Sequence, residues 1–235
     1  MSNAQMENRQ PLLEIRGLTK EFRQGKDRVK AVRQMDLDIY KGEVFGLVGE
    51  SGCGKSTFGQ MLVHLLDPTS GTITLAGEDI TRPARRERKD LCKRMQIVFQ
   101  DPYSSIDPNK TIGWLVEEPL RIHGIGKTQK ERDEKVGKVL KAVGLDDSYR
   151  TRWPNELSGG QKAKLLFLKM SLDGCNVLIL DEPTRNFSPL SGPVIRQVLK
   201  EYPGAIISIS HDRKYLEEVV DTTYELTEQG LVKRN

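Results

Sequence analysis

The chain has 235 residues and a net charge of +4, with 37% hydrophobic and 30% charged residues. These values predict a soluble globular protein with one sizeable α/β core, and a charge this small does not by itself indicate nucleic-acid binding. No apolar run approaches the roughly 20 residues of a membrane span, and the N-terminus lacks a signal-peptide pattern, so we expect any membrane role to require a partner protein.

The first part of the chain is predicted to be β-structure. Residues 1–11 are expected to be a disordered N-terminus or a tag, because they begin with a polar stretch. Residues 12–15 and 29–39 follow as short strands. Residues 35–39 alternate strictly between apolar and acidic side chains, so one face of that strand is expected to contact solvent.

A glycine-rich segment follows a buried strand at residues 44–48. It fits the pattern G-x-x-x-x-G-K-[ST] of a phosphate-binding loop and consists of Gly49, Glu50, Ser51, Gly52, Cys53, Gly54, Lys55, Ser56 and Thr57. Apolar residues then recur at helical spacing from Phe58 to Leu66, with Leu65 among them. The flanking strand and helix favour a phosphate site over the alternative, a plain glycine-rich turn.

The residue types in this loop suit a nucleoside triphosphate with a metal ion. Glycines let successive backbone N–H groups turn inward around phosphate oxygens, and the helix N-terminus adds partial positive charge. Lys55 would reach the β- and γ-phosphates, and the hydroxyl of Ser56 would bind Mg²⁺.

The next segment alternates strands with polar stretches. Residues 72–76 and 96–99 are predicted strands, and the second ends at Gln100, before a stretch dense in turn formers. Gln100 is a candidate to contact Mg²⁺ or the attacking water, because ligands bind at such strand ends in α/β folds. The alternative is a surface glutamine at a turn. The basic run 82–94 is best explained as a solvated helix face.

Residues 111–150 are predicted to be helical. Thr128 and Glu131 fit a capping box, apolar residues follow at helical spacing from Val136 to Val143, and Gly144 supplies a stop. The strands around the phosphate loop already form a sheet, so this helical segment is expected to be an insertion that forms a separate lobe.

A second possible anion site follows the helical segment. It consists of Leu157, Ser158, Gly159, Gly160 and Gln161. Ser158 and Gln161 fit a capping box, and the two glycines expose backbone N–H groups at a helix start. Since we find one phosphate loop in the chain, a second site for a γ-phosphate implies a second chain, arranged head to tail.

Two further strands end in polar side chains. Residues 177–180 lead into Asp181 and Glu182. Asp181 is placed to hold Mg²⁺ through water, and Glu182 is placed to polarise an attacking water. The alternative is that this acidic pair caps the N-terminus of a helix. A helix is predicted from about residue 193 to 202. Residues 205–210 then lead into His211, which could donate to a γ-phosphate, although a lone histidine is usually structural.

These segments, in this order across residues 12–230, resemble the nucleotide-binding subunit of ATP-binding cassette (ABC) proteins. The resemblance implies an α/β P-loop NTPase with a RecA-like core, an antiparallel β layer and a helical subdomain at about residues 101–160. It also implies binding of ATP and Mg²⁺ and an ATP-dependent dimer. Phe22 stands where that family stacks an aromatic ring on adenine; the alternative is a core phenylalanine.

Residues 94–108 and 118–124 further resemble the oligopeptide, dipeptide and nickel importer ATPases. In that class the helical lobe faces transmembrane permease subunits. The resemblance implies the motor subunit of an importer of peptides or a related small solute, in the cytoplasm at the inner face of the cell membrane, with no direct nucleic-acid contact.

The last third departs from the importer class. Residues 181–193 and 208–215 look more like ABC-F proteins, which act on ribosomes, although that family fuses two cassettes in one chain. Ser188 stands at the position of the family's D-loop aspartate. The alternatives are therefore an ABC-F-type ATPase that does not transport, or a subunit that works only as a heterodimer.

Overall fold

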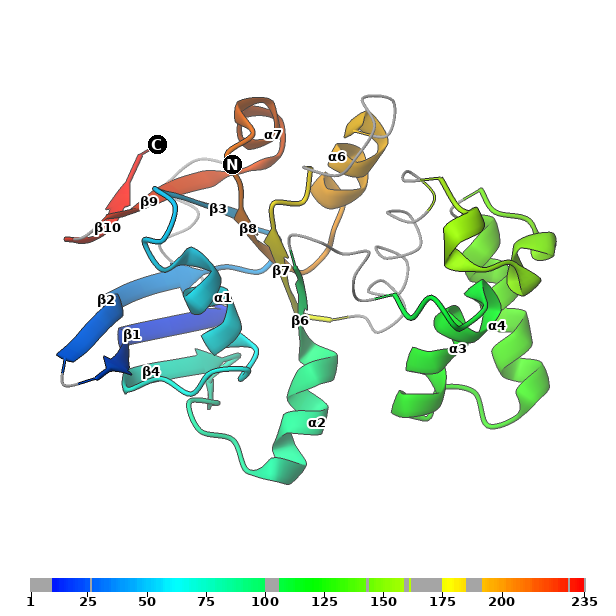
Figure 1. Ribbon diagram of the computed structural model, residues 1–235, viewed down its shortest axis with the longest axis horizontal. Helices are drawn as coiled ribbons and strands as arrows, with labels where there is room; N and C mark the ends of the chain where they lie inside the picture. The colour runs from blue at the N-terminus through cyan, green and yellow to red at the C-terminus, as the bar shows by residue number, and fades with distance from the viewer. Residues whose placement is uncertain are drawn as a thin grey trace.

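The computed structural model describes residues 10–25, 27–99, 106–142, 144–158, 161, 175–184, 192–227 and 229–234. These residues form two β-sheets and a group of helices at one end of the molecule (Figure 1). The architecture confirms the expected α/β fold with an antiparallel layer.

The antiparallel sheet has the strand order β2-β1-β4-β5. Its strands are β1 (Leu13–Gln24), β2 (Asp27–Ile39), β4 (Ser70–Leu75) and β5 (Glu78–Asp79). The expected strand at 12–15 was too short, because the ladder continues past Gly17 through a register shift. Gly17 has φ +57° and its N–H donates to Asp36 Oδ1 at 2.7 Å, which accommodates the irregularity.

Residues 35–39 show the predicted alternation. The apolar side chains of this segment are buried in the core, and Asp36 on the other face is exposed. The strand therefore presents one apolar face to the interior and one polar face to solvent.

The second sheet has the strand order β10-β9-β3-β8-β7-β6. Its strands are β3 (Val44–Val48), β6 (Met95–Val98), β7 (Val177–Asp181), β8 (Ala205–Ile209), β9 (Thr222–Thr227) and β10 (Gly230–Lys233). All neighbours pair in parallel except β9 and β10. The carboxyl ends of β3, β7 and β8 consequently meet at one edge, where open α/β sheets bind ligands.

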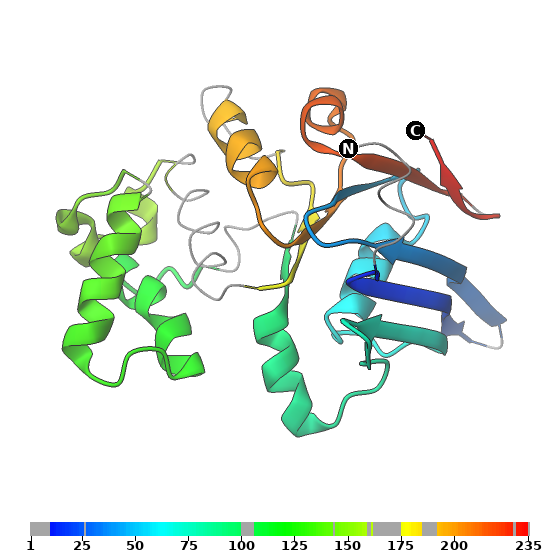
Figure 2. The ribbon, with the colours of Figure 1, turned by 180° about the vertical axis from the view of Figure 1, so that it is seen from behind.

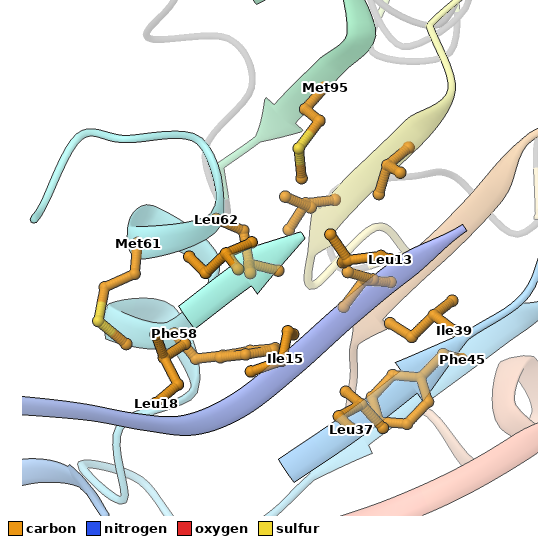
Figure 3. Packing of buried hydrophobic residues seen from close by; sticks show 14 of the residues in the cluster. Leu13, Ile15, Leu18, Leu37, Ile39, Phe45, Phe58, Met61, Leu62 and Met95 are labelled. Carbon is orange, nitrogen blue, oxygen red and sulfur yellow. The ribbon is translucent and has the colours of Figure 1, made fainter. Parts of the chain in front are cut away.

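The helix α1 (Lys55–Leu62) packs in the core formed with both sheets. Figure 3 shows Phe58, Met61 and Leu62 beside residues of β1, including Leu13 and Ile15. All of these side chains are fully buried. Because α1 begins directly after the glycine-rich loop, this packing fixes the position of the loop.

The predicted extent of this helix to residue 66 is wrong. α1 ends at Leu62, and His64 adopts a left-handed conformation with φ +57°. The amides of Leu65 and Leu66 both donate to the carbonyl of Gln60, which closes the helix end. Leu65, expected on the apolar face, is 59% exposed because the chain has already turned away.

His64 is buried beside the end of α1. Neither ring nitrogen has a hydrogen-bond partner among the described residues. Burial lowers the pKa of His64, and the nearby charge of Arg88 lowers it further, while Asp67 opposes both. The imidazole is therefore held in the neutral form, whose burial costs less than that of a cation.

Apart from Leu91, the other described helices contribute no residue to this core. They are α2 (Arg85–Arg94), α3 (Ile112–His123), α4 (Gln129–Ala142), α6 (Gly192–Lys200) and α7 (Arg213–Val219), with 3₁₀ turns η3 (Asp147–Thr151) and η4 (Pro154–Glu156). α2 buries Leu91 and is otherwise largely exposed, as predicted for the basic run. α6 and α7 contribute Leu199 and Tyr215 to a core on the parallel sheet. None of these helices has the length and apolar character to cross a bilayer.

α3, α4 and η3 form a helical lobe with its own apolar core. That core includes Ile112, Leu120 and Leu140, and it also takes in Leu157. Both ribbon views place this lobe at the opposite end of the molecule from the antiparallel sheet (Figures 1 and 2). The predicted helical stretch 111–150 is thus two helices and a 3₁₀ turn, interrupted where Gly124 ends α3 with φ +68°.

Replacing Phe58 by alanine should lower the free energy of unfolding by about 3–5 kcal/mol, because it leaves a cavity in the core. Denaturant unfolding measures this change. Leu65→Ala is the matched control in the same segment, and it should change the free energy by less than about 0.5 kcal/mol, as expected for an exposed site. Equal losses in the two variants would contradict the observed end of α1.

The stability of the protein should also depend on His64. Because its pKa is lowered in the folded state, the unfolded chain takes up the proton first as the pH falls below 6.5. His64 therefore removes stability on acidification, at a slope of at most about 1.4 kcal/mol per pH unit. Unfolding of wild type and His64→Asn between pH 7.5 and 5 tests this, since asparagine tolerates positive φ and does not titrate. If the free energy of unfolding of the variant fell as steeply with pH as that of wild type, a group other than His64 would cause the pH dependence.

Candidate active site

The glycine-rich loop occupies the turn between β3 and α1. Gly54 has φ +105°, and a Cβ atom there would lie 2.0 Å from the carbonyl oxygen of Ala31 on β2. Gly49 has φ +149°, and its Cβ would lie 2.6 Å from the carbonyl oxygen of Leu226 on β9. Both contacts would be with backbone atoms of paired strands, which cannot shift without disturbing the sheets. The loop is therefore held between β2 and β9, and only glycine fits at these two positions.

Lys55 lies inside this loop and is only 8% exposed. Its ammonium donates to the carbonyl oxygens of Gly49 at 2.8 Å and Glu50 at 2.7 Å, and lies 3.6 Å from Cys53 Sγ. A positive charge is thus concentrated at the start of α1, where the helix dipole also favours an anion.

Asp181 ends β7 beside this helix. Its Oδ2 accepts a hydrogen bond from Ser56 Oγ at 3.0 Å. Burial raises the pKa of Asp181, while the Ser56 hydrogen bond and the charge of Lys55 act in the opposite direction. Two hard oxygen atoms, one hydroxyl and one carboxylate, therefore lie together next to the loop, and this donor set fits Mg²⁺.

Glu182 and His211 follow the ends of β7 and β8. The amide of Glu182 donates to the carbonyl of Ile209 at 2.7 Å, and Glu182 has φ +52°, an uncommon conformation for this residue type. The His211 amide donates to Glu182 Oε2 at 3.5 Å, and His211 Nε2 lies 3.7 Å from Glu182 Oε1. The two side chains consequently face each other at the sheet edge.

One cavity of about 360 Å³ joins these groups. It is lined by Ala31, Ser51, Gly52, Gly54, Lys55, Ser56, Thr57, Asp181, Glu182, Ile209 and His211. Glu50 and Cys53 line a neighbouring cavity with Thr227. The structure thus brings together side chains from three parts of the sequence that were singled out separately.

Phe22, Leu157, Ser158 and Gln161 are not among the residues that line this cavity. Phe22 is 40% exposed on β1, opposite Val29, so its alternative assignment as a core residue is wrong. Leu157 is buried in the core of the helical lobe, and Ser158 and Gln161 form the predicted capping box through two reciprocal hydrogen bonds of 2.9 and 3.3 Å. Gln100, Gly159, Gly160 and Ser188 lie outside the described residues.

Two features of the site were not predicted from the sequence. The Ala31 backbone packs on the loop, which depends on tertiary placement of β2 and has no sequence signal. Tyr149 accepts a hydrogen bond from Gln161 Nε2 at 3.0 Å. A tyrosine twelve residues before Gln161 in an otherwise polar turn carries no recognisable motif.

A phosphate-type loop between a parallel strand and a helix, with carboxylates at the end of another parallel strand of the same sheet, defines a P-loop nucleoside triphosphatase. Residues 32–185 match the family described as ABC transporter. A solved ATP-binding cassette, in a dimeric post-hydrolysis state bound to ADP and Pi, matches with a TM-score of 0.82 at 24% identity, covering 95% of this chain and 99% of that chain. This likeness supports the fold.

Sequence relatives agree with this class. The chain is 37% identical over 224 residues to the oligopeptide transport ATP-binding protein OppF of Bacillus subtilis, covering 91% of this chain and 72% of the relative. It is 35% identical over 215 residues to a putative peptide import ATP-binding protein of Brucella ovis, covering 90% and 68%. The chain belongs to the ABC transporter family, and it is an ATPase of that family.

Lys55→Ala should weaken ATP binding at least tenfold, because it removes a charge-assisted contact to phosphate. A binding titration with a fluorescent ATP analogue measures the affinity. Lys41→Ala, at an exposed turn before β3, is the control and should bind like wild type. If Lys55→Ala folded normally and kept its affinity, the loop would not be the phosphate site.

Proposed function

We propose that this chain is the ATP-binding and ATP-hydrolysing motor subunit of an ABC importer of peptides or a related small solute. The observation that supports the proposal most directly is the single cavity shared by Lys55, Ser56, Asp181, Glu182 and His211. The names of the relatives, which are oligopeptide transport and peptide import ATP-binding proteins, supply the solute class.

In this proposal the loop binds the triphosphate of ATP. Its residues are Gly49, Glu50, Ser51, Gly52, Cys53, Gly54, Lys55, Ser56 and Thr57. The ammonium of Lys55 exchanges its loop carbonyls for β- and γ-phosphate oxygens, which are stronger acceptors because they are charged. Phe22, exposed on β1, offers a ring face on which adenine would stack.

Mg²⁺ would be held by Ser56 and Asp181, with Gln100 as a further candidate. The ion would neutralise charge on the β- and γ-phosphates. The hydroxyl of Ser56 donates to Asp181 Oδ2 at 3.0 Å, so the two oxygens lie close together beside the loop. Burial raises the pKa of Asp181, so a cation beside it would offset part of the cost of its charge.

Glu182 would orient and polarise the attacking water, since its carboxylate lies at the edge of the cavity. His211 faces Glu182, with 3.7 Å between Nε2 and Oε1, and can hold the carboxylate and donate to the γ-phosphate. Gln100 would complete the set. Positioning and electrostatic stabilisation account for most of the catalysis in phosphoryl transfer, which fits a site made of fixed charges and dipoles.

A second ATPase chain would supply the remaining contacts. Residues lining the described cavity include neither Ser158 nor Gln161, although both offer polar groups at a helix start. We infer that the segment 157–161 of one chain covers the γ-phosphate bound by the other, and that ATP brings two chains together. A homodimer and a heterodimer are both compatible with this arrangement.

The proposal also covers location and organisation. We propose that residues 12–230 form one nucleotide-binding domain, in which about 101–160 form the helical subdomain, and that residues 1–11 lie outside it. The chain would bind transmembrane permease subunits at the cytoplasmic face of the cell membrane, with no direct nucleic-acid contact. The relatives named above favour transport over the alternative, a ribosome-acting ATPase of ABC-F type.

Glu182→Gln should bind ATP with unchanged affinity but lower its turnover by at least about 100-fold, because the water loses its carboxylate partner. Phosphate release assays measure turnover. Glu217→Gln, an exposed carboxylate on α7, should retain the wild-type rate. Turnover near wild type in Glu182→Gln would refute the assigned role.

The same variant tests the assembly. Because Glu182→Gln should trap ATP, its solution mass with Mg-ATP should double if two copies of this chain suffice. A protein that binds ATP but keeps the monomer mass would refute the homodimer and direct the search to a different partner cassette. Co-purification from membranes and from ribosomes then separates transport from the ABC-F alternative.

A further inference from the structure

We propose that Tyr149 is a positioning residue for Ser158, and that it links the helical lobe to the nucleotide of the partner chain. The proposal rests on the proposed function of segment 157–161. Its starting point is a set of hydrogen bonds around Gln161, whose side chain joins the phenol of Tyr149 to the backbone N–H of Ser158 and whose own backbone N–H binds the Ser158 hydroxyl oxygen.

The hydrogen bonds have a definite direction. Gln161 Nε2 donates to Tyr149 Oη at 3.0 Å, and Gln161 Oε1 accepts from the amide of Ser158 at 2.9 Å. The amide of Gln161 donates to Ser158 Oγ at 3.3 Å. The hydroxyl of Ser158 accepts this bond and keeps its own proton to donate, as contact with a phosphate oxygen requires.

Tyr149 also fixes the orientation of the Gln161 amide. A capping-box glutamine needs its oxygen directed at the N-cap amide, and the phenol binds the opposite nitrogen. Without that partner, the amide group can rotate, and the backbone N–H of Ser158 loses its acceptor, Gln161 Oε1, for part of the time. A phenylalanine at position 149 retains the ring but cannot hold the amide.

Tyr149 is itself held by the lobe. The guanidinium carbon of Arg152 lies 4.0 Å from the centre of its ring, and the carbonyl of Arg152 accepts from the amide of Ile112 at the start of α3, at 2.9 Å. Arg150 binds the carbonyl of Asp133 on α4 at 2.5 Å. The turn η3 is therefore attached to both helices of the lobe.

A movement of α3 and α4 would consequently be transmitted to Ser158 through Tyr149. The lobe buries its own apolar core, so it can move as a unit. In the proposed importer, this gives a physical route by which a partner bound to the lobe changes the geometry at the γ-phosphate of the other chain.

The variant Tyr149→Phe tests the link in two ways. In the nucleotide-free protein, hydrogen–deuterium exchange at the amide of Ser158 should become about three- to tenfold faster, the effect of losing one neutral hydrogen bond. When Tyr149→Phe is combined with Glu182→Gln in the presence of Mg-ATP, the dissociation constant of the dimer should rise by a similar factor for each of its two nucleotide sites. ATP affinity of the monomer and the thermal midpoint should stay close to those of the parent, because the loop is untouched. A merely structural role would lower the thermal midpoint instead.

Trp153→Phe is the matched control, since it alters an exposed aromatic residue in the same segment. It should leave both readouts unchanged. Unchanged exchange at Ser158 in Tyr149→Phe would overturn the proposal, and so would faster exchange with an unweakened dimer. If the Glu182→Gln parent forms no dimer, the homodimer is refuted; the exchange result then decides the positioning role separately.

Discussion

The structure depends on one packing arrangement, the enclosure of α1 between the antiparallel sheet and the parallel sheet. Phe58, Met61 and Leu62 are fully buried there, and the glycine-rich loop begins immediately before them. The same arrangement brings the carbonyl of Ala31 so close to Gly54 that no side chain fits between them. The loop is therefore shaped by the core beneath it, and Lys55 is held inside the loop by the carbonyls of Gly49 and Glu50.

The buried charges of the site would be stabilised by a bound ligand that carries charges of both signs. A buried ammonium, two carboxylates and a histidine meet at the carboxyl ends of three parallel strands. Burial raises the pKa of Asp181, which shows that its charge is poorly solvated. A phosphate with a divalent cation satisfies both signs of charge together, whereas either ion alone would leave one of them uncompensated.

Much of this site could be predicted from the sequence because its parts follow local rules. Strands ending at residues 48, 181 and 209 are short apolar runs, and parallel strands place their carboxyl ends at one edge. The position of Ala31, the early end of α1 and the contact of Tyr149 with Gln161 depend instead on tertiary packing. Leu65 illustrates the limit, because its helical spacing is correct but His64 turns the chain before the pattern is completed.

The cavity lining includes neither Ser158 nor Gln161, and this has a consequence for the proposed mechanism. A site that held every phosphate contact within one chain could hydrolyse ATP without any partner. Here Ser158 follows Leu157, which is buried in the core of the helical lobe, and its hydrogen-bond partner Gln161 is bound by Tyr149 rather than by the loop. If its ligand is bound by another chain, the free energy of completing the γ-phosphate site becomes the free energy of association. ATP binding would then drive closure, and loss of the γ-phosphate would remove the contact that opposes opening.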